Sequence, residues 1–289
     1  MSVHAIQNAA LRIAVDSRGA ELASIRTGDG AEWLWQGDLA WWTGRAPILF
    51  PVVGRSPDDR ISIGGRQYPI AQHGFVRRSE FAVVEETATT LRFRHTDTIE
   101  TRKSYPFAFA LDVVFTLEGG TLSNRAEVRN SGPERMPVSL GFHPAFAWPL
   151  PGAGGKTHTL ALAEHEEPPT YRLGAGGLVV AEPEPSVFHG GMFAPAAEDF
   201  ARDAVILMEL RSRAITFGVE GGPSVAVGFA GMPQLGIWQK PGAPYLCIEP
   251  WQGTAAMAGA GDAIEVRPGV VWIEPGDFRT FTMTITPRA

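Results

Sequence analysis

Two short stretches each set one ionisable side chain among apolar neighbours. LGFHPAFAWP (140–149) surrounds His143 with phenylalanine and proline, and YLCIEPWQG (245–253) sets Glu249 before a Pro-Trp pair. Histidine titrates near pH 6.5, and a glutamate that is removed from water has a pKa raised above about 4.3. Groups with pKa values near neutrality suit general acid–base catalysis. His143 and Glu249 are therefore candidates for a catalytic acid and base.

Each residue alone has a plainer interpretation. A lone histidine in an apolar strand is most often a core residue whose hydrogen bonds are satisfied, and a glutamate before Pro-Trp is often a charge at a strand end. Other chemistries lack their motifs, since the sequence has no G-x-S-x-G, no phosphate-binding loop and no HExxH. No catalytic metal is therefore expected, although ligands from distant strands could still converge. Cys247 is expected to be a buried structural thiol.

The composition limits the class of protein. A net charge of -6 argues against a nucleic-acid partner, because phosphate backbones require an excess of clustered Lys and Arg. The single cysteine excludes an internal disulfide and any zinc site made of several cysteines. The first residues lack the pattern of a secretory signal, and no apolar run has the length of a membrane span. We expect a cytoplasmic protein, as a monomer or a homodimer, with no nucleic-acid or membrane partner.

Short strands must position these groups. The 33 glycines and 23 prolines are spread throughout the 289 residues and leave little room for long helices. Glycine turns divide 61–70, 113–130 and 214–230 into hairpins, and further strands are expected within 264–285. The stretch 150–200 is interpreted as long surface loops. The pattern predicts an all-β sandwich in which residues 1–289 form one domain.

Four segments in a fixed order carry a resemblance to a known family. FPVVGR (50–55), QHGFVR (72–77), GFHPAF (141–146) and CIEPWQG (247–253) together resemble the aldose 1-epimerases, or galactose mutarotases, with LacX-like proteins as the most similar branch. The resemblance implies a large β-sandwich of the galactose mutarotase-like supersandwich type. It also implies an isomerase that interconverts the α and β anomers of an aldohexose, by acid–base catalysed ring opening, in an open cleft. No cofactor is implied, and the expected partner is a small sugar.

The same resemblance suggests roles for particular residues. It matches His143 to the general acid, Glu249 to the general base and His73 to a second, substrate-binding histidine. Asp203 is the candidate for an acidic residue that holds sugar hydroxyls. The ring of Trp251, next to the Glu-Pro pair, could stack on the apolar face of a sugar.

Two arginines compete for one substrate-binding position. Arg55 ends the VVGR segment, whereas Arg60 is followed by isoleucine, as the family pattern requires. We favour Arg55, because the neighbours Asp58 and Asp59 suggest that Arg60 lies in a solvated turn.

Two alternative functions stay open at this point. A hexose-6-phosphate 1-epimerase would need cations for a phosphate, and five arginines are expected near the cleft: Arg45, Arg55, Arg60, Arg77 and Arg78. Of Arg77 and Arg78, at least one is expected to be solvated. A non-catalytic carbohydrate-binding protein of the same fold is the other alternative, but a pure binder needs neither an acid nor a base.

Overall fold

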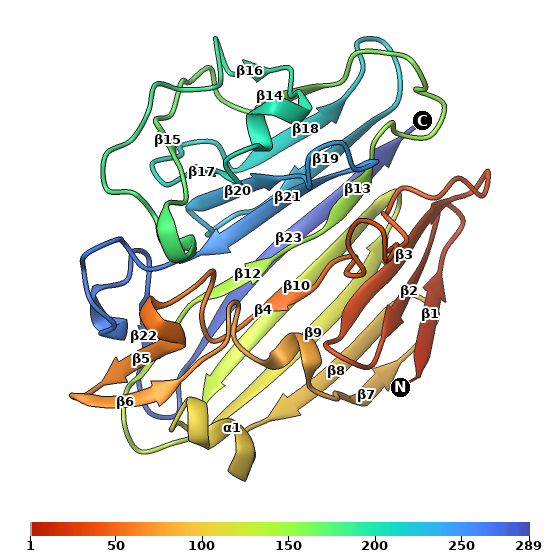
Figure 1. Cartoon of the computed structure of the whole chain (residues 1–289). Coiled ribbons are helices and arrows are strands. Elements are labelled where there is room, and N and C mark those ends of the chain that lie inside the picture. The colour runs from red at the N-terminus through yellow and green to blue at the C-terminus, as the bar shows by residue number, and fades with distance from the viewer. Residues whose placement is uncertain (1) are drawn as a thin grey trace.

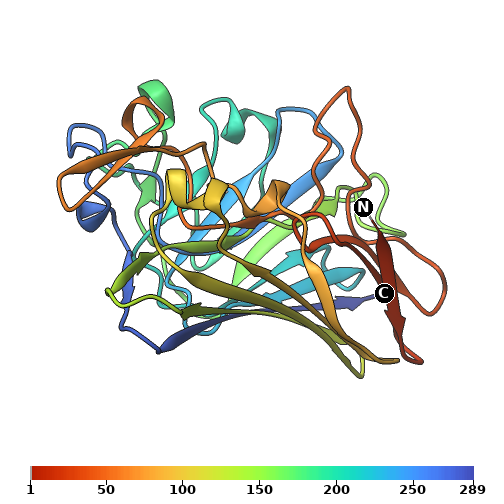
Figure 2. The ribbon, with the colours of Figure 1, turned by 90° about the horizontal axis from the view of Figure 1, so that it is seen from below.

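Two large antiparallel sheets form most of the molecule. The computed structural model describes residues 2–289, and its sheets lie one above the other as two layers (Figures 1 and 2). Strands pair through antiparallel ladders throughout. The predicted all-β sandwich is confirmed.

The first sheet has nine strands. Its long central members show strict alternation, since β10 buries every second residue from Leu122 onward. Alternation of this kind is expected for a strand with one face on the core and one face in water. In spatial order the strands are β16 (Met192–Phe193), β14 (Thr159–Leu162), β18 (Ala214–Gly218), β19 (Ser224–Gly228), β23 (Phe278–Arg288), β10 (Thr121–Asn130), β9 (Phe109–Glu118), β8 (Thr90–Thr96) and β7 (Ala82–Glu86).

The second sheet has seven strands and lies on the first. Its members are shorter and mostly buried. In spatial order they are β15 (Thr170–Tyr171), β17 (Val205–Leu207), β20 (Gln234–Trp238), β21 (Tyr245–Gln252), β12 (Leu140–Phe142) and β4 (Ile48–Leu49), and β13 (Ala145–Ala147) also pairs with β21.

Smaller elements surround the two sheets. A three-stranded sheet at the N-terminal end is formed by β1 (Val3–Gln7), β2 (Leu11–Asp16) and β3 (Glu21–Thr27). The two-stranded pairs are β5 (Arg60–Ile63) with β6 (Arg66–Pro69), and β11 (Met136–Val138) with β22 (Val271–Ile273). The helical segments are α1 (Ile99–Ser104) and the 3₁₀ turns Pro57–Asp59, Val76–Arg78, Ala175–Gly177, Ala197–Phe200 and Ile264–Val266. Among residues 2–289, no helix has the length and apolar content that crossing a membrane requires.

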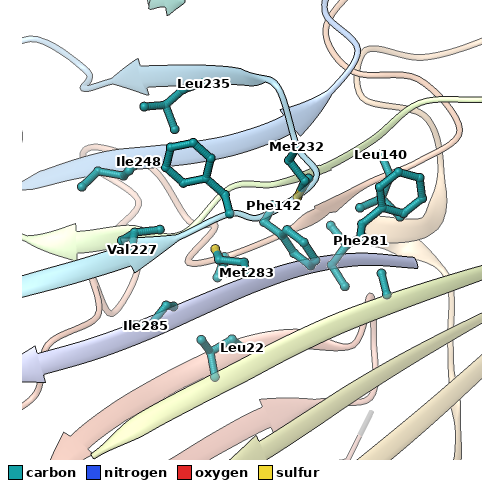
Figure 3. Close-up of a cluster of buried hydrophobic side chains, with 14 of the residues drawn as sticks. Leu22, Leu140, Phe142, Val227, Met232, Leu235, Ile248, Phe281, Met283 and Ile285 are labelled. Atoms are coloured by element: carbon teal, nitrogen blue, oxygen red, sulfur yellow. The ribbon is translucent and has the colours of Figure 1, made fainter. Parts of the chain in front are cut away.

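The core fills the space between the two large sheets. Phe281, Met283 and Ile285 of β23 meet Ile248 of β21 and Phe142 of β12 there (Figure 3). Burial of such side chains contributes roughly 1.5–3 kcal/mol each. This interface therefore holds the second sheet rigidly against the first.

Strand β21 is buried on both of its faces, whereas antiparallel strands commonly have one face in water. Leu246 and Ile248 point into the core between the sheets. Because side chains alternate along a strand, Cys247, Glu249 and Trp251 point to the opposite face. There they are covered by loops, and this covered face carries the candidate site.

The three hairpins expected from glycine turns are present as β5–β6, β9–β10 and β18–β19. The interpretation of 150–200 as surface loops is wrong in part. Leu160 of β14 and Phe193 of β16 are buried at one edge of the nine-stranded sheet, and β15 extends the other sheet. These strands have only two to four residues, too short to show a period. The start of 264–285 is also a 3₁₀ turn rather than a strand.

Candidate active site

A cavity of about 250 Å³ opens on the face of the seven-stranded sheet that points away from the core. This volume is slightly below the common range for small-molecule sites, as suits a small polar ligand. Its lining includes most of the ionisable groups singled out in the sequence: His73, His143, Asp203 and Glu249, with Arg77, Gln72, Trp42, Trp238, Trp251 and the small or aliphatic residues Gly54, Leu173, Gly177, Ala204, Ile206 and Ala255.

His143 lies directly after β12, where the chain passes from the core to the cavity. Phe142 is buried in the core, so the next side chain points to the opposite face and into the cavity. The His143 backbone N–H donates to the Pro47 carbonyl at 3.1 Å, which holds this position against the neighbouring segment. The apolar residues around His143 therefore wall a proton-carrying group that faces the cavity.

His143 and Glu249 form one buried pair. His143 Nε2 lies 3.1 Å from Glu249 Oε2, and the two residues are 8% and 1% exposed. Burial lowers the pKa of His143 to about 3. Burial first, and then the nearby charge of Asp203, raise the pKa of Glu249 well above its usual value. Burial thus disfavours the charged form of both partners, and we interpret them as a pair that shares a single proton between the carboxyl and the imidazole Nε2.

His73 is oriented by backbone contacts to a neighbouring loop. The Gly54 N–H donates to His73 Nδ1 at 3.1 Å, and the His73 N–H donates back to the Gly54 carbonyl at 3.0 Å. Because Nδ1 accepts, the neutral ring carries its proton on Nε2. Burial and then the neighbouring His143 hold the pKa of His73 well below its usual value. His73 is therefore a neutral donor at the cavity.

Hydrogen bonds from the buried Arg267 hold the loop that carries Gly54. This guanidinium is 4% exposed and donates to the Val53 carbonyl at 2.7 Å, to Ser56 Oγ at 2.6 Å and to the Thr254 carbonyl at 3.0 Å. Gly54 has φ +69° and packs so closely on Ala255 that a Cβ would lie 2.4 Å from its side chain. Only glycine fits this position, and the loop is fixed on both sides.

Three tryptophans form the walls. The ring of Trp42 lies on His143 with centroids 5.0 Å apart, and Trp238 meets the same imidazole edge-on at 5.9 Å. Trp251 occupies space left by Gly236 of the next strand, where a Cβ would lie 2.3 Å from the indole. These aromatic faces form an apolar wall beside the His143–Glu249 pair.

Asp203 and Arg77 line the cavity with opposite charges. The main chain of Asp203 has φ +69°, and its Oδ1 accepts from the Ala204 N–H at 2.8 Å. Arg77 Nη2 donates to the Gln72 carbonyl at 2.9 Å, while its buried Nε has no hydrogen-bond partner within residues 2–289. A carboxylate and a guanidinium on one cavity provide an acceptor and several donors for hydroxyl groups.

The two arginines weighed in the sequence lie outside this lining. Arg55 packs its aliphatic stem behind Gly177 of the cavity wall, with its Cδ 3.1 Å from where a Cβ of that glycine would be, and it approaches Asp59 at 3.9 Å. Arg60 lies on the β5–β6 hairpin and donates to Gln67 at 3.2 Å. That one of them binds the sugar stays a prediction, and the structure adds Arg77 as a third candidate.

Comparisons with known proteins agree with this geometry. A model of the family described as aldose 1-epimerase matches residues 2–269. The plasmid and chromosomal LacX proteins of Lactococcus lactis subsp. lactis are each 31% identical, over 97% of this chain and 98% of theirs. The chain belongs to the aldose 1-epimerase family. The predicted family resemblance, including its LacX-like branch, is confirmed.

Solved structures of family-like proteins share the fold over the whole chain. A galactose mutarotase related enzyme from Lactobacillus acidophilus is 28% identical with a TM-score of 0.92, covering 100% of this chain and 98% of that one. A galactose mutarotase-like protein from Lactobacillus casei is 27% identical with a TM-score of 0.90, covering 99% and 100%.

Several residues that line the cavity were not indicated by the sequence patterns. Trp42, Trp238, Gln72 and Leu173 line the cavity, as does Arg77, which was weighed only as one of five possible phosphate ligands. The adjacent pair Trp41-Trp42 in the polar segment GDLAWWTGR was the one available signal, since tryptophans in a loop are rarely needed for the core. Arg78 is exposed, in agreement with the expectation that one of the two arginines is solvated.

The structure also places a thiol beside the acid–base pair. The ligand atoms of His143, Cys247 and Glu249 all lie within 4.8 Å of one another. Spacing in the sequence could not reveal this, because Cys247 and Glu249 come from β21 and His143 from the end of β12.

That no catalytic metal takes part remains a prediction. Turnover is not expected to fall after dialysis against a chelator, because an acid–base pair can transfer protons without a metal. The measurement is the initial rate before and after dialysis. Loss of turnover that one added metal restores would contradict the prediction.

Proposed function

We propose that this member of the family is an aldose 1-epimerase that interconverts the α and β anomers of an aldohexose. The observation that carries the proposal is the His143–Glu249 pair, with 3.1 Å between its nitrogen and oxygen, at a cavity walled by three tryptophans. Burial of an acid and a base at one point costs free energy, because each must be removed from water, and such strongly perturbed groups are concentrated at functional sites.

The proposed reaction requires two proton transfers. A base takes the proton of the C1 hydroxyl and an acid protonates the ring oxygen, so that the C1–O5 bond breaks and the open-chain aldehyde forms. Rotation about C1–C2 and closure on the other face give the second anomer. Glu249 is the base and His143 the acid in this scheme, with the reverse transfers on closure.

The protonation of the resting pair is compatible with these roles. The neutral pair has one proton on the carboxyl, and transfer of that proton to Nε2 gives imidazolium and carboxylate without loss or gain of a proton. A sugar hydroxyl that donates to the carboxylate favours this charged form, since hydrogen bonds to a carboxylate lower its pKa. Substrate binding therefore prepares the pair for catalysis.

Other cavity groups fit the binding of an uncharged sugar. His73 presents an N–H donor, Asp203 an acceptor and Arg77 several donors. The three tryptophans supply apolar area, and they keep water from the aldehyde intermediate.

The hexose-6-phosphate alternative has one specific observation in its favour. Arg77 faces the cavity with a buried Nε that lacks a hydrogen-bond partner within residues 2–289. The other four arginines lie outside the lining, and among them the Arg45 Nε already donates to the Gln36 carbonyl at 2.9 Å. A single guanidinium in a cavity that also contains the Asp203 carboxylate suits a hydroxyl group better than a dianionic phosphate.

A direct assay separates these candidates. NMR saturation transfer or polarimetry should follow anomer interconversion for a panel of free and 6-phosphorylated aldohexoses. We expect catalysis of at least one free aldohexose at a rate well above the spontaneous one. Catalysis of phosphorylated sugars alone would favour the alternative, and binding without catalysis of any sugar would favour a carbohydrate-binding protein.

The pH dependence tests the one-proton pair. We expect kcat/KM to be constant across neutral pH and to fall on the acid side only towards pH 3, where the pair takes up a second proton, because the pKa of His143 is about 3. On the alkaline side kcat/KM should fall about tenfold per pH unit once the pair loses its proton, at a pH above the usual range of glutamate. Spontaneous mutarotation is measured and subtracted at each pH. An acid limb near pH 6.5, the value of an ordinary histidine, would contradict this protonation scheme.

A further inference from the structure

Cys247 lies beneath the acid–base pair, and the proposed reaction does not use it. It is 0% exposed and stands two residues before Glu249 on the same face of β21. Its neighbours in the packing are Ala145, Ala243 and Tyr245, with Trp42 and Trp238 partly covering them. The thiol does not line the cavity, but Trp42 and Trp238, which do, pack against the cluster that contains it.

The spacing of three side chains approaches that of a metal site. His143 Nε2 and Glu249 Oε2 are 3.1 Å apart, and one nitrogen of His143, the Cys247 sulfur and one carboxylate oxygen of Glu249 all lie within 4.8 Å of one another. Ligand atoms on one tetrahedral zinc ion lie roughly 3.3–3.7 Å apart, given bonds of about 2.0–2.3 Å. The sulfur therefore has to approach by at most about 1.5 Å to complete this geometry.

The donor set selects a particular class of cation. An imidazole, a thiolate and one carboxylate are ligands that zinc and cadmium bind well, whereas magnesium and calcium require mostly oxygen ligands. The cavity provides an open fourth position for water. The neighbouring charges act in both directions, because Asp203 attracts a cation and Arg77 repels it. His143 Nδ1 is buried without a hydrogen-bond partner within residues 2–289, so no hydrogen bond from this nitrogen restrains the ring.

We propose that His143, Cys247 and Glu249 form a binding site for a thiophilic divalent cation, with Zn²⁺ as the physiological candidate, and that the bound ion inhibits the enzyme. Binding displaces the thiol proton and the shared proton of the pair to the buffer, so the site holds a thiolate, a carboxylate and a neutral imidazole. The inhibition rests on the proposed function, because it follows from removing the acid and the base together. The binding does not rest on it.

Two measurements test binding and inhibition separately. Cd²⁺ is titrated into the metal-free full-length protein while the ultraviolet charge-transfer band of a cadmium thiolate is recorded. Zn²⁺ is then titrated into the anomer-exchange assay, with Mg²⁺ as the control cation. We expect a band that saturates at one Cd²⁺ per chain, inhibition by Zn²⁺ that a chelator reverses, and no effect of Mg²⁺.

Two variants of Cys247 make the assignment specific. Cys247→Ala should fold, keep its uninhibited turnover, lose the cadmium band and need at least about tenfold more Zn²⁺ for the same inhibition. Cys247→Ser retains the size of the side chain and should behave likewise if alanine proves unstable. The exposed histidines provide a control, because His165→Ala and His189→Ala should leave the band and the inhibition unchanged.

The outcomes separate this inference from the proposed function. Absence of the band in the unmodified protein, or equal Zn²⁺ inhibition of the unmodified protein and Cys247→Ala, would overturn the inference. A band that requires Cys247 in a protein with no anomer exchange on any sugar would support the cation site and overturn the proposed function.

Discussion

Replacement of His143 by asparagine is expected to lower kcat by roughly two to four orders of magnitude, and Glu249→Gln is expected to do the same. This is the usual contribution of a positioned acid or base. Both replacements keep a similar shape and part of the hydrogen bonding, so the 3.1 Å contact between the two positions is largely retained. The loss should appear in kcat rather than in KM, because the proton and not the binding contact is removed.

The double variant gives a sharper test of the shared proton. Because one proton serves both residues, loss of either disables both transfers. His143→Asn combined with Glu249→Gln should therefore be little slower than each single variant. Fully additive losses would show that the two residues act independently.

Thermal unfolding of the same variants provides the control. A core histidine without a catalytic role would, on replacement, lower the unfolding temperature and spare the kcat of the folded fraction. Near-normal kcat in a destabilised His143→Asn protein would overturn the proposed mechanism. We expect small changes in unfolding temperature, because the removed ionisable groups contribute little packing volume.

Replacement of Arg77 by methionine is expected to lower kcat/KM by about ten- to a hundredfold, mainly through KM. A hydrogen bond to a charged group contributes about 1.5–3 kcal/mol, and Arg77 is the arginine that lines the cavity. Methionine keeps the length of the side chain and much of its packing, so loss of the guanidinium dominates.

Arg55→Ala and Arg60→Ala complete the series. Arg55 packs behind Gly177 of the wall, so its loss should have a smaller effect than that of Arg77. The Arg60 side chain donates to Gln67 in the neighbouring strand of its own hairpin, so Arg60 serves as the control, with an expected change close to none. A large effect of Arg60→Ala with none of Arg77→Met would reverse this order. An effect of Arg77→Met on phosphorylated sugars alone would favour the phosphate alternative.

Much of the fold follows from local patterns in the sequence. Glycine turns between short runs of alternating residues predicted the hairpins β5–β6, β9–β10 and β18–β19, since turn chemistry and side-chain alternation act within a few residues. The chemistry of His143 and Glu249 was also visible, because the apolar residues that remove water from each are adjacent to it in sequence. The strands of 150–200 are too short to carry a period, and only pairing with distant strands defines them.

What the sequence alone determined about this protein is its all-β class, its three glycine-turn hairpins and the identity of His143 and Glu249 as reactive groups. Only the tertiary structure decided that His143 and Glu249 touch, that Arg77 rather than Arg60 faces them, and that Cys247 lies beneath. The physical reason is that the direction of a side chain along a strand is local, whereas its neighbours across a sheet depend on strand order and register. Those are set by how the two large sheets bury their apolar faces on each other, and this burial involves residues from the entire chain.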